Sequence, residues 1–177
     1  MKTYAATAES IISAMGLSLI LLTAKVEAFE LVTASGTSAN PPIGGNGGSS
    51  LPQITGDGRF VLFMSSAGNF VAGPTTTPLP SLFPHRMNVF LRDRSNNLTT
   101  LVSFNAAGTA GGNGDSIPAG VSTNGRYALF ESSASDLIAS DTNNASDVFV
   151  RDLISGTNNL VSATLSGLPG NGASRSA

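Results

Sequence analysis

The chain has 177 residues, of which 11% are charged and 41% are hydrophobic, and its formal net charge is −2. This balance provides no basic surface for nucleic acid or for an anionic membrane. Cysteine is absent, which excludes disulfide bonds, thiolate metal sites and cysteine nucleophiles. Short, regularly spaced apolar runs argue against a disordered chain, so we expect a folded protein without nucleic acid among its partners.

Residues 1–28 have the three regions of a secretory signal peptide. Lys2 gives a basic start, 11–24 is an apolar run, and 26–28 places small residues where a signal peptidase cleaves. The apolar run is shorter than the roughly 20 residues of a membrane span. We therefore expect a secreted, periplasmic or cell-surface protein with no membrane span after cleavage. An uncleaved anchor and a buried helix are the alternatives.

From residue 29 to residue 177, one sequence pattern occurs twice and then begins again. The first unit covers about 46–112, the second about 113–170, and the start of a third 171–177. A pattern of this length is typical of repeat architectures, in which each unit buries its apolar face against its neighbours. From the unfinished third unit we expect a fragment of a longer repeat protein, with a truncated reading frame as the alternative.

Each unit contains four short segments rich in strand-forming residues and separated by turn signals. In the first unit we expect strands at 52–55, 59–65, 88–94 and 100–104, and in the second at 119–122, 126–132, 147–153 and 159–163. The proline-rich segment 73–84 is a loop, because proline cannot donate to a central strand. Four antiparallel strands in each unit predict an all-β fold of β-propeller-type blades.

The motifs resemble a known family. Asn124-Gly125-Arg126-Tyr127, Asp147-Val148-Phe149-Val150-Arg151-Asp152 and Leu160-Val161-Ser162 are similar to the WD40-like repeat of TolB-type propellers. The first unit departs from this pattern at its proline-rich loop and at Asn88, which stands where the second unit has Asp147. The resemblance implies a bacterial source and a protein-binding role. Propellers typically have four to eight blades, so we expect an incomplete propeller that needs further blades or other copies.

One loop of the second unit is a candidate calcium site. Asp141, Asn143 and Asp147 provide oxygen ligands at alternate positions, as calcium-binding loops do. However, the loop lacks the glycine at its sixth position and the distant bidentate glutamate of such loops. The alternative is an Asx-rich turn in which short polar side chains bind the backbone.

Other polar residues favour structural roles. Arg92-Asp93 and Arg151-Asp152 recur in both units, which indicates a scaffold contact more than a ring of ligand-binding residues. His85 lies in the proline-rich loop with no candidate partner beside it, so we predict a solvated residue. No Gly-x-Ser-x-Gly elbow or phosphate-binding loop occurs, and we predict no catalytic or cofactor-binding residue.

We therefore expect a non-catalytic, exported scaffold that binds proteins, ligands or further blades. Two alternatives remain open. The first is an accessory propeller domain of a secreted hydrolase whose catalytic part is absent here, and the second is a calcium-dependent adhesion module.

Overall fold

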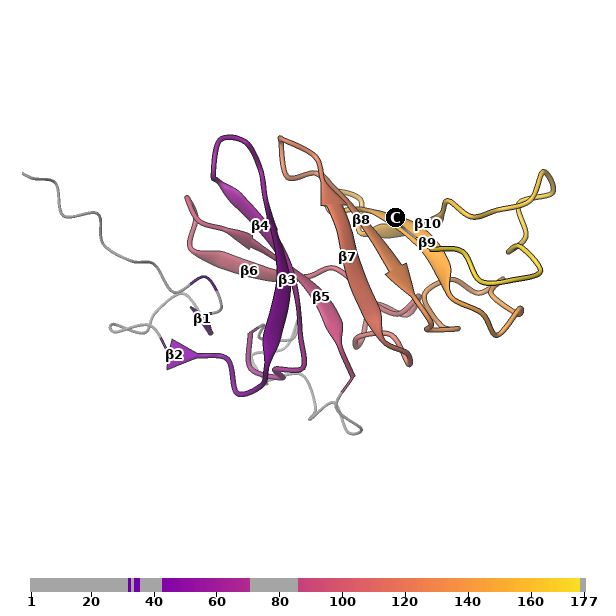
Figure 1. Cartoon of the computed structure of the whole chain (residues 1–177), viewed down its shortest axis with the longest axis horizontal. Helices are drawn as coiled ribbons and strands as arrows, with labels where there is room; N and C mark the ends of the chain where they lie inside the picture. Colours follow the sequence, from indigo (N-terminus) through magenta and orange to yellow (C-terminus); the bar gives the residue numbers. More distant parts are fainter. Residues whose placement is uncertain (1–31, 33, 36–42, 71–85, 176–177) are drawn as a thin grey trace, which may run out of the picture. The chain divides into compact units, whose positions relative to one another are not determined.

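The computed structural model describes residues 32, 34–35, 43–70 and 86–175. In this part of the chain all regular structure is β-strand, and no helix is present (Figure 1). The all-β prediction is therefore confirmed for the described residues. The predicted signal peptide, the proline-rich loop and His85 lie outside them.

The strands form one short pair and two four-stranded antiparallel sheets. The pair contains β1 (Ala34–Ser35) and β2 (Ile43–Gly44). The first sheet contains β3 (Ser49–Ile54), β4 (Phe60–Ser65), β5 (Asn88–Asp93) and β6 (Leu98–Leu101). The second sheet contains β7 (Ser116–Val121), β8 (Tyr127–Ser132), β9 (Asp147–Asp152) and β10 (Thr157–Leu160).

The two sheets have the same strand order and the same register. The Phe63–Phe90 pair of β4 and β5 corresponds to the Phe130–Phe149 pair of β8 and β9. The two ring pairs are stacked alike, with centroids 5.8 and 5.7 Å apart and an interplanar angle of 24° in each. The motifs shared by the two halves of the sequence therefore occupy equivalent places in two similar sheets.

The last strand of each sheet begins and ends earlier than predicted. The sequence placed these strands at 100–104 and 159–163, whereas β6 ends at Leu101 and β10 ends at Leu160. The cause is a change in the backbone hydrogen bonds after β6. The amides of both Val102 and Ser103 donate to the carbonyl of Val89, and one acceptor shared by two donors breaks the regular ladder.

The first strand of each sheet is longer than predicted and contains a proline. β3 and β7 are edge strands of their sheets, and the pairing shifts near Pro52 in β3 and after Pro118 in β7. Proline lacks an amide hydrogen and is tolerated at edges and bulges. The sequence expectation began these strands too late because it started them at or after the proline.

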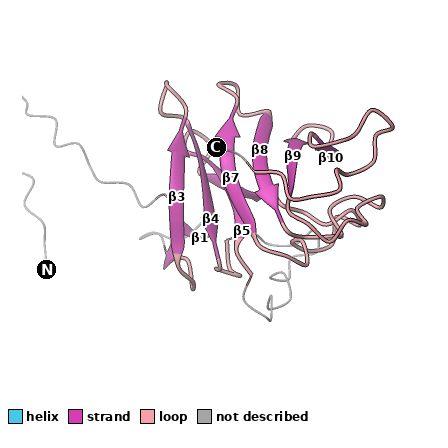
Figure 2. Ribbon diagram, turned by 45° about the vertical axis from the view of Figure 1, so that its right-hand side comes forward, coloured by secondary structure: helices cyan, strands magenta, loops and turns pink. Residues whose placement is uncertain are grey.

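A shared hydrophobic core joins the two sheets. Both sheets contribute buried side chains to it, namely Phe60, Leu62, Val89, Leu91 and Val102 from the first and Ala128, Phe130, Ala134, Leu137 and Phe149 from the second. β7 lies beside β3 and β4 (Figure 2). Burial of a large apolar side chain contributes about 1.5–3 kcal/mol, so this core is the main contact between the sheets.

The opposite face of the first sheet is covered by segments of its own chain. Phe63, Phe90 and Leu101 of the sheet pack there with Phe70 and Ala67, and Val32 and Phe104 join at the margin. The Phe70 ring lies nearly perpendicular to both stacked rings, with its centroid 5.6 Å from that of Phe63 and 5.1 Å from that of Phe90. The first sheet is therefore covered on both faces.

Candidate functional site

One face of the second sheet carries the apolar pattern that the first sheet uses for packing, but nothing described covers it. In the first sheet Phe60, Leu62, Val89, Leu91 and Val102 are all at most 7% exposed. The matching residues of the second sheet are Tyr127, Leu129, Val148, Val150 and Val161, which we call the open face. Tyr127 is 42% exposed and Val161 is 54% exposed, and the other three are half-buried.

The backbone that follows the second sheet makes the same hydrogen bond as the backbone that follows the first sheet. The Ser116 amide, which starts β7, donates to the Met87 carbonyl at 2.8 Å. The amide of Ser174 donates to the carbonyl of Ser146 at 2.7 Å, and these two residues hold the corresponding positions. The backbone after β10 is thus oriented as it is where the second sheet begins.

The recurring arginine and aspartate residues tie each sheet to its turns. Nε and Nη2 of Arg126 donate to the carboxylate of Asp152, and Oδ1 of Asp152 also accepts the backbone amide of Ile154. The hydrogen bond from Arg126 lowers the pKa of Asp152 well below its ordinary value. Arg59 and Asp93 make the same pair in the first sheet. These contacts agree with the scaffold interpretation.

Arg151 has different surroundings from these exposed arginines. It lies on the face of the second sheet that packs on the first, and its side chain is buried. Nη1 donates to Oδ1 of Asn158 at 2.9 Å, and the guanidinium lies 5.0 Å from the centroid of the Phe104 ring. Nε is buried and has no hydrogen-bond partner among the described residues. Burial lowers the pKa of Arg151.

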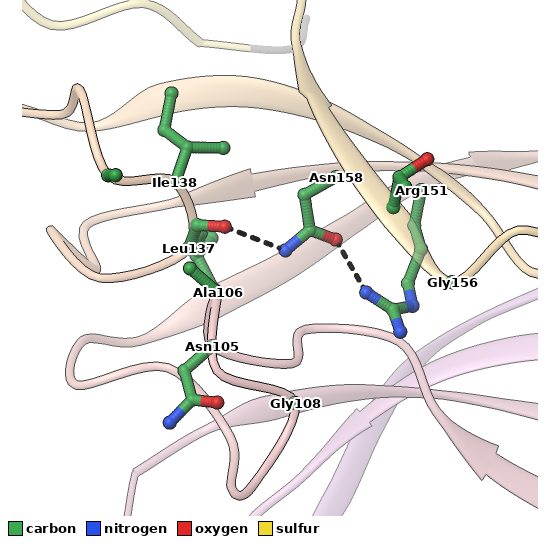
Figure 3. A pocket seen from close by; sticks show the side chains of 10 residues that line it. Asn105, Ala106, Gly108, Leu137, Ile138, Arg151, Gly156 and Asn158 are labelled. Atoms are coloured by element: carbon green, nitrogen blue, oxygen red, sulfur yellow. Dashed lines mark hydrogen bonds between the residues drawn. The ribbon is translucent and has the colours of Figure 1, made fainter.

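A cavity of about 280 Å³ opens beside Arg151 (Figure 3). It is lined by Asn105, Ala106, Gly108, Leu137, Ile138, Ala139, Arg151, Gly156, Thr157 and Asn158. Leu137 and Arg151 are buried, whereas Ala106, Ala139 and Gly156 are exposed and form the rim. Asn158 links β10 to the two loops that line the cavity, because its Nδ2 donates to the carbonyls of Phe104 and Leu137 at 2.8 and 3.0 Å.

The sequence did not reveal this pocket, because its residues come from two separate loops and from the hairpin of β9 and β10. A signal was nevertheless present. Position-by-position comparison of the two units shows Gly156 where the first unit has Asn97, and Asn158 where it has Thr99. Gly156 and Asn158 both line the pocket, so these two differences between otherwise similar units indicate where the second unit has its cavity.

The candidate calcium residues lie close together. Nδ2 of Asn143 donates to Asp147 Oδ2 at 2.7 Å and to the Gly170 carbonyl at 2.8 Å, while Oδ1 of Asn143 accepts the Ala145 amide. The Asn143 oxygen therefore makes the hydrogen bond of an Asx turn. Asp147 Oδ1 accepts the Ser162 hydroxyl at 2.6 Å.

Asp141 is the exceptional member of this loop. Its carboxylate is buried, and neither oxygen has a hydrogen-bond partner of normal geometry among the described residues. Burial and, to a smaller extent, the nearby Asp147 carboxylate raise the pKa of Asp141, while the backbone amide of Asn143 acts in the opposite direction. In the described part of the chain, no three acidic or histidine side chains gather in a metal-binding cluster. The calcium site stays a prediction.

Comparison with protein-family models, with curated proteins and with solved structures finds no match for this chain. Among the residues that the structure describes, no helix is long and apolar enough to cross a membrane. The open face and the pocket are therefore the two features of the described residues that bear on function.

Proposed function

We propose that this chain is an exported, non-catalytic scaffold of the β-propeller type, whose open face binds a further four-stranded sheet of the same pattern. The observation that carries the proposal is the correspondence between the open face and the packed face of the first sheet. Because those positions of the first sheet bury their side chains against a neighbouring sheet, the same positions of the second sheet have a suitable shape for another one.

The partner of the open face has a defined chemistry. The first sheet packs against the side of the second sheet that presents Ala128, Phe130 and Phe149, together with Ala134 and Leu137 from the loop after β8. A further sheet would offer small and aromatic side chains in this arrangement. The Ser174 contact supports the proposal, because it starts the following segment in the position from which β7 is built.

The pocket beside Arg151 also supports a binding role over a catalytic one. Its polar side chains are a guanidinium, two amides and a hydroxyl. These groups form hydrogen bonds but do not exchange protons readily near neutral pH, as a general acid or base must. The bacterial source, the exported location and the propeller identity rest on the signal-peptide pattern and the TolB-like motifs.

The proposal is tested by adding one unit to the chain. A second copy of residues 113–170 is inserted between Gly170 and Asn171, where the Asn-Gly-x-Ser motif begins again. The urea midpoint and the m-value of the full chain are compared with those of the extended chain. We expect both to rise, because the open face becomes buried and more surface is exposed on unfolding.

A control variant distinguishes sheet stacking from a general effect of length. Val161→Asp in the original unit should have little effect in the parent chain, where this side chain is half exposed. In the extended chain it places a carboxylate in the new core and should abolish the rise in midpoint. An extended chain with the parent midpoint, or one that is indifferent to Val161→Asp, would contradict the proposal.

The calcium-dependent module remains the second candidate function. The observation that favours it is the Asp141 carboxylate, because a buried carboxylate without hydrogen bonds is costly unless a cation or a proton neutralises it. The Asx turn at Asn143 favours a structural loop instead.

A further inference from the structure

Both sheets bury an arginine at the same position, but only the first sheet supplies acceptors to both of its terminal nitrogens. In the first sheet Nη1 of Arg92 donates to Oγ1 of Thr99 at 3.2 Å, and Nη2 donates to Oδ1 of Asn97. Asn97 lies in the turn between β5 and β6 with a positive φ of 54°. The conformation of this turn thus lets the Asn97 side chain reach the buried guanidinium of Arg92.

In the second sheet no described residue accepts a hydrogen bond from Nη2 of the corresponding arginine, Arg151. Asn158 takes the position of Thr99 and accepts from Nη1 of Arg151 at 2.9 Å. Gly156, which has a positive φ of 72°, takes the position of Asn97. A Cβ atom added to Gly156 would lie 3.7 Å from Nη2 of Arg151, so the space beside this nitrogen is the space that Asn97 fills in the first sheet.

The pocket lies beside Arg151 and Gly156, where the first sheet has the Asn97 side chain. Gly156 and Arg151 both line the cavity of about 280 Å³, together with Asn158 (Figure 3). The exposed glycine leaves this side of the rim without a side chain. A cavity of this volume is just below the usual range for drug-sized ligands, and it suits a small molecule or one terminal group of a larger one.

The charge of Arg151 indicates which group fits there. The guanidinium is buried, and it forms no ion pair with a described carboxylate. A buried cation without a counter-ion is costly. Arg59 and Arg126 use their Nε and Nη2 atoms to bind a carboxylate, which shows the geometry that this edge of a guanidinium prefers.

We propose that the pocket between Arg151 and Gly156 binds a carboxylate group of a small ligand. One carboxylate oxygen takes the place that the Asn97 amide oxygen has in the first sheet, and the anion neutralises the buried guanidinium. A monoanion matches the single positive charge of the site. This inference concerns a different surface from the open face and does not depend on the stacking of a further sheet.

The test is an NMR titration of the full chain with sodium acetate at constant ionic strength. The backbone amides of Thr157 and Ala139, on opposite sides of the rim, report on binding. We expect saturable chemical-shift changes with a dissociation constant of about 1 mM, because a ligand of four heavy atoms offers few contacts. The same titration with inorganic phosphate should give weaker binding.

Two variants of the site identify the binding group. Gly156→Asn supplies the amide oxygen that Asn97 supplies in the first sheet, and it should fill the pocket and weaken acetate binding roughly tenfold or more. Arg151→Met removes the charge but keeps a long apolar side chain, and it should have the same effect. Gly167→Asn is the matched control, since Gly167 has a φ of 78° and a Cβ atom added there would meet nothing within 4 Å. It should bind acetate like the parent.

Each outcome decides the proposal. Loss of acetate binding in Gly156→Asn, with retention in Gly167→Asn, supports it even if Arg151→Met does not fold. No saturable shift in the folded parent chain overturns it, and so does equal binding in Gly156→Asn. Tighter binding of phosphate than of acetate would overturn the assignment to a carboxylate.

Discussion

At the scale of single residues, burial separates the two roles of the aromatic side chains. Phe130 is completely buried in the core between the sheets, and its equivalent Phe63 is 2% exposed in the cluster on the opposite face of the first sheet. The repeat makes these two positions equivalent in sequence, yet among the described residues only Phe130 lies between the two sheets.

Phe130→Ala should lower the free energy of unfolding by about 3–5 kcal/mol, because it leaves a cavity in a packed core. Phe63→Ala should cost a similar amount, since it also removes the ring that stacks on Phe90. Urea denaturation monitored by circular dichroism measures both values. A loss below about 1 kcal/mol in either variant would mean that its surroundings are not packed as described.

At the scale of secondary-structure elements, equivalent turns have different neighbours. The turn before β4 and the turn before β8 each contain a glycine with positive φ, 72° at Gly58 and 69° at Gly125. A Cβ atom on Gly125 would lie 2.4 Å from the Phe60 ring, whereas at Gly58 the nearest atom is Arg94 Nη1 at 3.5 Å. The second turn therefore packs directly on the first sheet.

Gly58→Ala should cost about 1 kcal/mol of stability, because alanine rarely adopts a positive φ. Gly125→Ala should cost about 1–3 kcal/mol more, since the methyl group also displaces Phe60. Thermal unfolding of the two variants provides the comparison, in which Gly58→Ala controls for the backbone strain. Equal losses would show that the turn does not press on Phe60.

At the scale of the whole described region from Val32 to Arg175, the shared core makes the two sheets one cooperative unit. Each sheet buries one face in this core, and Gln53 of β3 donates to the carbonyl of Pro118 in β7 at 3.2 Å. Neither sheet could keep its apolar face away from water alone. We therefore expect the sheets to unfold together.

Leu62→Ala should lower the hydrogen-exchange protection of β5 and of β9 by the same free energy, about 2–5 kcal/mol, although the substitution lies in the first sheet. Native-state hydrogen exchange at the amides of Phe90 and Phe149 measures this. Tyr127→Ala, on the open face, is a control that should change both values little. Loss of protection in β5 alone would indicate that the sheets unfold independently.

The sequence by itself determined the strands and their order, because alternating apolar residues and Asx-Gly turns are local signals. It also predicted the match between the two sheets through motifs such as Asp147–Asp152. The ends of β6 and β10 could not be predicted, since they depend on a carbonyl shared by two amides across the sheet. The candidate site was determined only in part. The calcium site at Asp141, Asn143 and Asp147 stays a prediction, although Nδ2 of Asn143 does donate to Asp147.

Only the tertiary structure decided which apolar faces are covered and where the pocket lies. Val102 and Val161 have the same local sequence, yet one is fully buried and the other is half exposed, because only the first has a sheet packed against it. Arg151 likewise becomes a candidate ligand-binding residue only where the Phe104 loop buries it and Gly156 leaves a space beside it. Burial depends on residues far away in the chain, and a local pattern carries no information about them.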